Sequence, residues 1–597
     1  MDGHVVTRGL VLLLALGACE FDRPKDIGSV KVTVRGLWDG SDGIEVSLVI
    51  AGTSTPLPFA DDGDSGTFTT PAGTPYEVVI DRQPTAHTCA VADAAGALAE
   101  ALVVRVTCTG PVMLGTEPAF DVDQGPREQR LPVSLLSQLV QFRPSGPDTA
   151  TLTIDDVPLV INTPRVYSLP TGDTTFRIVM QSGALSKTMT ITFDRGAAAI
   201  VQDPPTRPPL PAAGGQFGSA ISMTNNTIMV GTPGKNLVRT FVRNGRAWVP
   251  ASDLTPPLGA SERFGASVSL NGDALIVGAP GLAVSDRGSA HIFERQAGVW
   301  TVKYNTTVDV MTGDDQLGYA VALAGGRAVV GGPTKGDLAP VRALLKNAAA
   351  MWQFDATIAS PDQQASDLFG AALALRGATA IIGAPMGDGV SPTTNSSGRV
   401  YTFDHTTSWT QTALIEPAVR GATDQFGAAV ALELTGPDQV LVVGAPFEDG
   451  ATVDDPTDDG VRDSGAAYVF RRTGTGPWVQ EAYLKPSNRG QQFNFGAAVA
   501  IADELIAIGA PGEDSCAAGV DPAVMPGCNS AGAVFVFEHT AQGWREVAYL
   551  KSAAVHAQDV FGRGLTLTPN FLVAGAPADD GAGSVDEIEG GVVYPFH

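Results

Sequence analysis

The sequence predicts an all-β chain in which a seven-bladed β-propeller follows two β-sandwich domains. Two short motifs recur together seven times in its last 380 or so residues. The first is an aromatic residue or leucine followed by glycine, and the second is Gly-x-Pro at the end of a short apolar run. The pairs stand 47 to 69 residues apart, a period typical of repeat architectures. With 69 glycines, 42 prolines and 17% charged residues, the composition suits many short strands joined by turns.

The N-terminus has the pattern of a secretory signal over residues 1–18, because Arg8 precedes the apolar stretch 10–16 and small residues follow it. The string Leu16-Gly17-Ala18-Cys19 is similar to the bacterial lipoprotein signal, which implies lipidation of Cys19 and a tether over 19–27. The alternative is an ordinary secretory signal with an incidental cysteine. Glu20, in place of an aspartate after the cysteine, favours the outer membrane or cell surface of a bacterial envelope.

Four further cysteines fit an oxidising compartment and two local disulfides, Cys89 with Cys108 and Cys516 with Cys528. A zinc site is the competing interpretation, but the paired spacing that zinc sites use is missing. The net charge of −25 argues against nucleic acid and against direct contact with anionic lipid, so we expect membrane contact only through the lipid anchor. We expect a monomer.

Two β modules precede the repeats. Residues 28–108 alternate apolar and polar residues between turn clusters, which predicts a sandwich and resembles the immunoglobulin-like module of bacterial lipoproteins. Residues 109–196 predict a second sandwich, whose latter half resembles a cadherin-like domain of bacterial surface proteins. A proline-rich stretch, 203–216, is expected to act as a stiff linker.

Each repeat offers four strands; in the sixth they are 497–501, 505–508, 533–537 and 544–550. A tryptophan at the start of strand four lies 16 or 17 residues before the next repeat in six cases, whereas the loop after Gly-x-Pro varies in length. A constant framework with one variable loop per repeat predicts a propeller whose variable loops lie on one face. The first motif occurs at Phe217-Gly218, Phe264-Gly265, Leu317-Gly318, Phe369-Gly370, Phe426-Gly427, Phe495-Gly496 and Phe561-Gly562.

The propeller domain is expected to span 197–597 and to close on itself. The seventh repeat stops after its third strand, 592–596, so its fourth strand is missing. Counting 17 residues back from Phe217 leads to Ile200, which predicts that the segment 197–202 supplies that strand. Closure of this kind removes exposed sheet edges.

These motifs resemble the FG-GAP repeats of integrin α-chain propellers and their bacterial relatives, over about two-thirds of the chain. The resemblance implies calcium-binding loops in the hairpin between the two motifs. In this chain, however, hairpins such as 271–273 and 325–327 carry too few carboxylates to bind Ca²⁺. A better candidate for Ca²⁺ is the acidic loop of the fifth repeat, where the alternative is turn chemistry in a solvated loop. Its acids are Asp449, Asp454, Asp455, Asp458, Asp459 and Asp463.

A second set of acids lies two residues before the aromatic of the first motif, and its recurrence predicts a structural role in capping backbone amides. Its members are Glu262, Asp315, Asp367, Asp424 and Asp559.

No nucleophile elbow, zincin motif or phosphate loop occurs, so we predict no catalytic residues and a protein that is not an enzyme. The predicted function is adhesion to a surface protein or glycan through the propeller loops; the alternatives are an envelope hydrolase of polysaccharide or phosphoester and a purely structural envelope protein.

Overall fold

The computed structural model describes residues 27–597 with gaps at 36–43, 51–52, 60–64, 72–74, 85–86, 93–94, 98–101, 110–112, 118–127, 148, 208–213, 225, 245–246, 258–261, 282–286, 307–315, 334–340, 360–361, 363, 365, 389–394, 453–456 and 580–589. The predicted signal, the tether and the lipidated Cys19 therefore lie outside the described residues. The described residues form strands and one short 3₁₀ turn, η1 (Pro233–Lys235), which confirms an all-β chain. They divide into two compact units, Met1–Ala199 and Ile200–His597.

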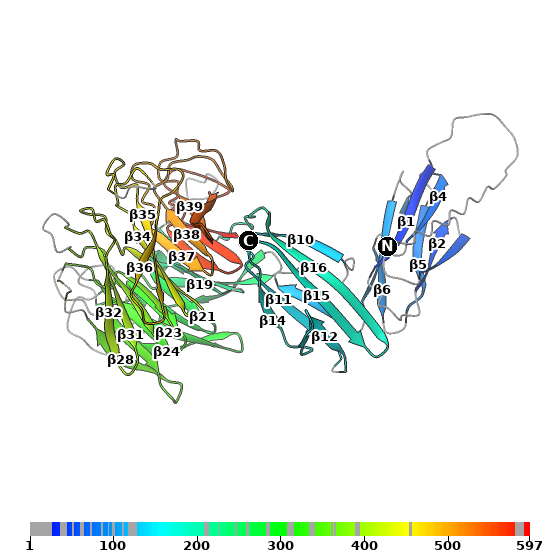
Figure 1. Ribbon diagram of the computed structural model, residues 1–597, viewed down its shortest axis with the longest axis horizontal. Helices are drawn as coiled ribbons and strands as arrows, with labels where there is room; N and C mark the ends of the chain where they lie inside the picture. Colours follow the sequence, from blue (N-terminus) through cyan, green and yellow to red (C-terminus); the bar gives the residue numbers. More distant parts are fainter. Residues whose placement is uncertain are drawn as a thin grey trace. The chain divides into compact units, whose positions relative to one another are not determined.

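The first unit begins with two four-stranded sheets that share one core, drawn in blue in Figure 1. One sheet has the order β4 (Ser65–Pro71), β1 (Ile27–Arg35), β8 (Leu102–Thr109), β6 (Thr88–Ala92), and the other β3 (Thr53–Phe59), β2 (Ile44–Ile50), β5 (Pro75–Arg82), β7 (Ala95–Ala97). Alternate residues of both sheets, such as Val34 and Val46, are buried between them. Cys89 in β6 is disulfide-bonded, and its register partner in β8 is Cys108.

The second part of this unit has a five-stranded and a three-stranded sheet around another core. Their orders are β10 (Glu128–Ser134), β16 (Leu185–Ala198), β15 (Gly172–Ser182), β12 (Thr151–Ile154), β13 (Val157–Leu159), and β14 (Arg165–Ser168), β11 (Leu139–Ser145), β9 (Met113–Glu117). The Phe142 ring makes edge contacts with Phe176 and Phe193 at centroid distances of 5.4 and 6.3 Å. These contacts join the two sheets, because Phe142 belongs to β11 and its partners to β15 and β16.

The second unit contains seven small sheets, each built from consecutive strands of one repeat. Repeats one to three comprise β17 (Ile221–Thr224), β18 (Thr227–Thr232), β19 (Leu237–Asn244), β20 (Ala247–Leu254); β21 (Ser267–Asn271), β22 (Ala274–Ala279), β23 (Ser289–Gln296), β24 (Val299–Asn305); β25 (Ala320–Ala324), β26 (Arg327–Gly331), β27 (Val341–Lys346), β28 (Trp352–Ile358). Repeats four and five comprise β29 (Ala372–Arg376), β30 (Thr379–Ala384), β31 (Arg399–His405), β32 (Trp409–Ile415); β33 (Ala429–Thr435), β34 (Asp438–Ala445), β35 (Ala466–Thr473), β36 (Val479–Leu484). Repeats six and seven comprise β37 (Ala498–Ala502), β38 (Leu505–Ala510), β39 (Ala533–Thr540), β40 (Gly543–Leu550); β41 (Gly564–Thr568), β42 (Phe571–Ala576), β43 (Val592–Phe596).

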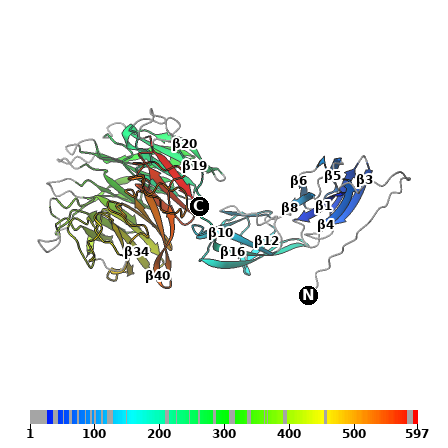
Figure 2. The same ribbon diagram turned by 90° about the horizontal axis from the view of Figure 1, so that it is seen from above.

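The seven sheets form a cyclic series. Their first strands contact one another in sequence order from β17 to β41, and β41 also contacts β17. Figure 2 shows the red C-terminal strands beside the green strands of the first repeat. The second strand of each repeat, flanked within its sheet and covered by neighbouring sheets, is almost wholly buried; β38 and β42 have no exposed residue. The fourth strands are more exposed than the second strands, and in β32 half-buried and exposed residues alternate.

Closure of the series uses the segment from Val201 to Thr206, which pairs antiparallel with β43. Val201 and His597 exchange two backbone hydrogen bonds of 3.0 Å, and Thr206 and Val593 exchange bonds of 2.8 and 3.0 Å. The predicted fourth strand of the last repeat is thus present, a few residues later than expected. Residues 197 and 198 belong to β16 instead, so the unit boundary falls after Ala199 and not after residue 196.

The proline-rich stretch 203–216 is therefore not a linker along its whole length. Asp203 and Thr206 donate backbone hydrogen bonds to β43, at 2.9 and 2.8 Å. Pro204 and Pro205 lie between these donors, and prolines are tolerated on an outer strand because a ladder there needs donors only on one side. The remaining residues of the stretch, 208–213, are outside the described part of the chain.

The tryptophans of strand four are constant in spacing because several bridge consecutive repeats. The indole Nε1 of Trp352 donates to Glu294 at 2.9 Å, and that of Trp544 donates to Glu481 at 3.0 Å. Trp409 donates in the same way to Asp355 at 3.0 Å. In each case the acceptor belongs to the preceding repeat, so the indole fixes the spacing of two neighbouring sheets.

Candidate functional site

The loops that vary between repeats lie at one edge of the sheets, which we call the Gly-x-Pro edge. In each antiparallel sheet the first strand begins where the second strand ends, and the third begins where the fourth ends. The aromatic-Gly motif, the Gly-x-Pro motif and the loop that follows it therefore share this edge. A binding surface can vary here without disturbing the strands.

The residue directly before each aromatic-Gly pair adopts a left-handed backbone conformation in all seven repeats, with φ between 45° and 62°. The residues are Gln216, Arg263, Gln316, Leu368, Gln425, Asn494 and Val560. The glycine of each pair follows with φ between 88° and 95°. Sequence reasoning missed this feature, because the residues share neither size nor charge.

Four of these left-handed residues line a cavity of about 430 Å³ at the Gly-x-Pro edge. They come from repeats one, two, six and seven, which are neighbours in the cyclic series. Arg263 and Arg563 both line the cavity, and neither makes an ion pair within the described residues. Two arginines in a chain of net charge −25 make this cavity a candidate site for a ligand with an acidic group. The described residues that line the cavity are Gln216, Ser219, Arg263, Asn494, Pro511, Gly512, Ser530, Val560, Arg563, Pro577 and Ala578.

The acids two residues before the aromatic cap backbone amides, as predicted, in the three cases with described hydrogen bonds. The Oδ2 atoms of Asp367, Asp424 and Asp559 accept the backbone N–H of the residue three positions earlier, at 2.8, 2.7 and 2.7 Å. Burial raises the pKa of Asp424 to about 7, and the negative charges of Glu448 and Asp449 add to this shift. Glu262 uses its backbone carbonyl in a bond to Gly281, and Asp315 is outside the described residues.

The aspartates three residues after the proline close the variable loops. Asp388, Asp449 and Asp514 each accept a backbone N–H from the far end of their loop, at 2.8, 2.7 and 2.9 Å. Their donors are Ser396, Asp463 and Ser530. In these three repeats the carboxylate therefore has a turn-forming role.

The six acids proposed for Ca²⁺ in the fifth repeat are not brought together as one described ligand set. Besides the Asp449 bond, Asp458 accepts the N–H of Gly460 at 3.0 Å. Asp463 pairs with Arg462 at 3.2 Å, and Asp459 lies near enough to influence Asp424 electrostatically. Asp454 and Asp455 are outside the described residues.

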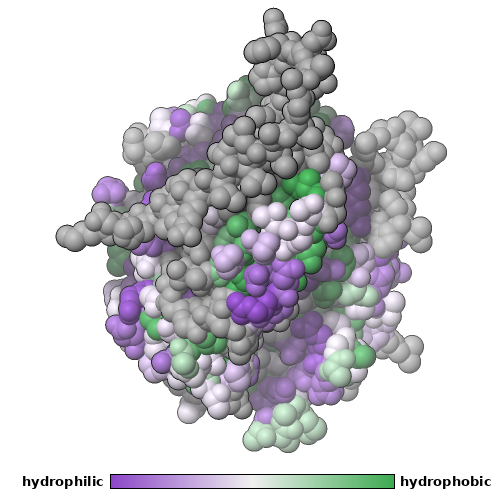
Figure 3. All heavy atoms as spheres, turned by 90° about the vertical axis from the view of Figure 1, so that its right-hand side faces the viewer, coloured by the Kyte–Doolittle hydropathy of each residue, from purple (hydrophilic) through white to green (hydrophobic). Residues whose placement is uncertain are grey.

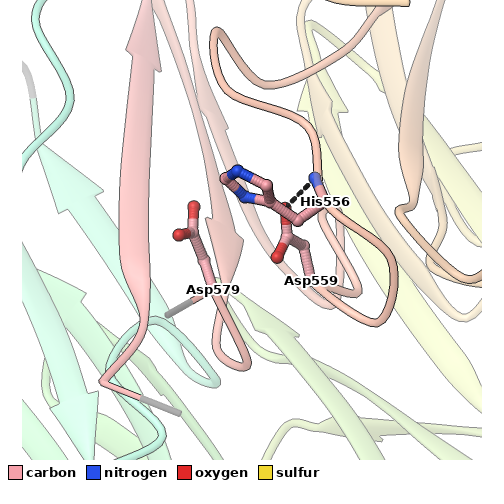
Figure 4. A group of neighbouring side chains, drawn as sticks. All are labelled: His556, Asp559 and Asp579. Carbon is pink, nitrogen blue, oxygen red and sulfur yellow. Dashed lines mark hydrogen bonds and ion pairs between the residues drawn. The ribbon is translucent and has the colours of Figure 1, made fainter. Parts of the chain in front are cut away.

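The described residues instead bring together one group with metal-ligand chemistry, in the seventh repeat. The ligand atoms of His556, Asp559 and Asp579 all lie within 4.8 Å of one another. Figure 4 shows the imidazole and the two carboxylates turned toward a common space. Asp559 belongs to the recurring acids two residues before the aromatic, and Asp579 stands three residues after the proline of its Gly-x-Pro motif, whereas the histidine belongs to no recurring set. The signal was the one repeat in which a histidine stands five residues before the aromatic.

Two buried ion pairs occupy equivalent places in repeats five and six. Lys485 Nζ contacts Glu448 at 2.6 Å, and Lys551 Nζ contacts Glu513 at 2.5 Å; both lysines are fully buried. A tyrosine hydroxyl donates to each glutamate, from Tyr483 at 2.6 Å and from Tyr549 at 2.9 Å. Burial lowers the pKa of both lysines, and the glutamates counteract it.

The predicted disulfide between Cys516 and Cys528 is present in the variable loop of repeat six, with a Cα–Cα distance of 5.0 Å. It closes a loop that also carries the Asp514 bond to Ser530. A cross-linked loop loses less entropy when it meets a ligand.

On the face drawn in Figure 3, hydrophilic and hydrophobic residues are interspersed among the described residues.

Strands repeated in a cyclic series, with variable loops gathered at one edge, define a β-repeat protein of the kind that presents interaction loops from a rigid scaffold. The FG-GAP repeat family model matches the chain at residues 248–293, 352–403, 409–470 and 478–537. Over these four stretches the chain is similar to the FG-GAP repeat family. No curated protein matches the chain. Within the described residues, no helix has the length and apolar character needed to cross a membrane.

Proposed function

We propose that the second unit is a seven-bladed β-propeller that serves as a non-catalytic interaction head. The first unit is the stalk, an immunoglobulin-like and a cadherin-like β-sandwich, and Cys19 carries the lipid that holds the protein in the outer membrane of a bacterial envelope. The head acts as a monomer in adhesion. Its partner is a surface protein or glycan.

The observation that carries this proposal is the cavity at the Gly-x-Pro edge. It is lined by left-handed residues of four repeats, of which Arg263 is one, and by a second arginine, Arg563, whereas the loops around it differ in length and charge. Concave sites with a few convergent polar groups are the usual form of a ligand site. The arginines select a partner that presents carboxylate, sulfate or phosphate groups, since guanidinium groups pair with these in a bidentate geometry.

The test uses the full chain against a panel of acidic and neutral glycans and of envelope proteins, with binding measured by surface plasmon resonance. We expect saturable binding to an acidic partner and at least a tenfold loss in the Arg263→Ala, Arg563→Ala double variant. Arg376→Ala is the matched control, because Arg376 ends β29 at the opposite edge of the sheets. Equal binding by the double variant and the parent would contradict the assignment of this edge.

A hydrolase is the second candidate, favoured by one observation. Asp424 is buried with its pKa raised to about 7, near the carboxylates of Asp449 and Glu448, and paired carboxylates with separated pKa values serve as acid and base in glycoside hydrolysis. Turnover of an acidic polysaccharide that disappears in Asp424→Asn would support this candidate. The absence of turnover across the panel would leave the interaction role in place.

A further inference from the structure

We propose that His556, Asp559 and Asp579 form a binding site for a divalent transition-metal ion in the seventh repeat. This site is argued from its own geometry and does not depend on the partner proposed above. It is also distinct from the acidic loop of the fifth repeat. Figure 4 shows the three side chains together.

The distances fit an ion and do not fit a direct hydrogen bond. His556 Nδ1 lies 3.6 Å from Asp559 Oδ2, which is too long for a hydrogen bond between them. Two ligand atoms that are each about 2.0–2.2 Å from a metal lie roughly 3–4 Å apart. All three ligand atoms fall within 4.8 Å of one another, so small side-chain movements complete the coordination.

Both carboxylates are buried and oriented by hydrogen bonds. Asp559 and Asp579 are each 1% exposed. Asp559 Oδ2 accepts the backbone N–H of His556 at 2.7 Å, and Asp579 Oδ2 accepts the hydroxyl of Tyr594 at 2.5 Å. Donors of this kind hold ligating carboxylates in place in metal sites.

The imidazole completes the set from the solvent side. The His556 side chain is 44% exposed, yet its Nδ1 atom is shielded from solvent and has no hydrogen-bond partner in the described structure. A nitrogen in this position, turned toward two carboxylates, is suited to ligation when the imidazole is neutral.

The other repeats show that the fold itself does not require this histidine. In repeat four the capping aspartate Asp367 accepts the N–H of Gln364, and in repeat five Asp424 accepts that of Gly421. The glycine makes the same cap with no side chain at all. The imidazole of His556 is therefore additional to the structural motif, and ligation gives it a role.

The donor set selects the class of ion. One imidazole nitrogen with two carboxylate oxygens suits Zn²⁺, Mn²⁺, Fe²⁺ or Co²⁺, whereas Ca²⁺ prefers a set made only of oxygen atoms. The nearby Lys551 does not compete for the site, because its ammonium group is held by Glu513 at 2.5 Å.

The experiment titrates the full chain, freed of metal by dialysis against chelator, with Zn²⁺ in a calorimeter and with Co²⁺ by visible absorption. We expect one equivalent of Zn²⁺ whose affinity falls at least tenfold in His556→Gln, together with loss of the Co²⁺ absorption bands. His539→Gln is the matched control; this histidine lies beside Glu481 at 3.0 Å, outside the group, and its loss should change neither signal.

Three results would overturn the proposal: no Zn²⁺ binding by the parent chain, unchanged binding in His556→Gln, or displacement of Zn²⁺ by an equal concentration of Ca²⁺. Asp559→Asn serves as a second ligand variant, but its loss of a cap can also affect folding. The His556→Gln variant is decisive, because the side chain is half-exposed and the fold makes the same cap with glycine in repeat five.

Discussion

Gly575 in the seventh repeat lies directly against Gly218 in the first, so that a Cβ atom added to Gly575 would stand 2.1 Å from the Gly218 carbonyl oxygen. The same approach joins consecutive repeats, for example Gly509 with the Gly562 carbonyl, also at 2.1 Å. Within each repeat the backbone N–H of the glycine in the first motif donates to the carbonyl oxygen of the Gly-x-Pro glycine, as Gly562 does to Gly575 at 2.9 Å. The two motifs recur together because they form one contact that sets the distance between neighbouring sheets.

This contact predicts that Gly575→Ala strongly destabilises the repeat unit. The methyl group would meet backbone atoms that cannot move without separating the first and seventh sheets, at a cost of about 2–4 kcal/mol. Urea unfolding of the full chain measures the change. Gly326→Ala is the control, since the nearest atom to its added Cβ is 3.4 Å away. Equal stability of the two variants would contradict the close-contact explanation.

The pairing of the segment 201–206 with β43 predicts a specific sensitivity at Thr206. Thr206→Pro removes the donor of the 2.8 Å bond to Val593, whereas Thr206→Ala keeps it. We expect the proline variant to lose about 1–3 kcal/mol of stability relative to the alanine variant. Hydrogen exchange of the β43 amides should rise in the proline variant alone. Unchanged protection there would argue against closure by this segment.

The buried carboxyl of Asp424 predicts a pH-dependent gain from Asp424→Asn. The pKa of Asp424 is about 7 in the folded chain against an ordinary value of 3.8, so between these values the native state holds a proton that the unfolded chain has lost. The contribution of this carboxyl to the free energy of unfolding therefore falls as pH rises through that window. Asparagine accepts the Gly421 N–H without a charge. We expect the variant to exceed the parent in melting temperature at pH 8, with a smaller difference at pH 5.

The control for that measurement is Asp458→Asn, which replaces an aspartate that accepts the Gly460 N–H at 3.0 Å in the acidic loop of the same repeat. Its melting temperature should follow the pH dependence of the parent. A gain for Asp424→Asn that is the same at both pH values would show that the charge of Asp424 is not its cause.

The fully buried pair of Lys551 and Glu513 predicts strong coupling between the two residues. Lys551→Met leaves the glutamate without its cation and should cost about 3–5 kcal/mol. Glu513→Gln in the same chain should recover at least half of that loss, because glutamine still accepts from Tyr549 and carries no charge. A double-mutant cycle by urea unfolding gives the coupling free energy, and additive effects would contradict it.

The sequence alone determined the all-β class, the repeats and the strands within them. In repeat six the ends of the predicted strands differ from the observed ones by at most three residues. Such features are local: alternation along a strand and glycine at fixed intervals are properties of short stretches of chain. The missing strand of the last repeat also followed from counting, because the interval from strand four to the next motif is constant.

Only the tertiary structure decided which side chains meet. His556 and Asp579 are 23 residues apart and lie on different loops, so no spacing rule connects them. The cavity at the Gly-x-Pro edge is lined by residues of four repeats that share a backbone angle and not a residue type. The boundary after Ala199 likewise depends on which partner strand each residue finds. Local pattern fixes the strands, whereas contacts between repeats depend on how the sheets pack around their common centre.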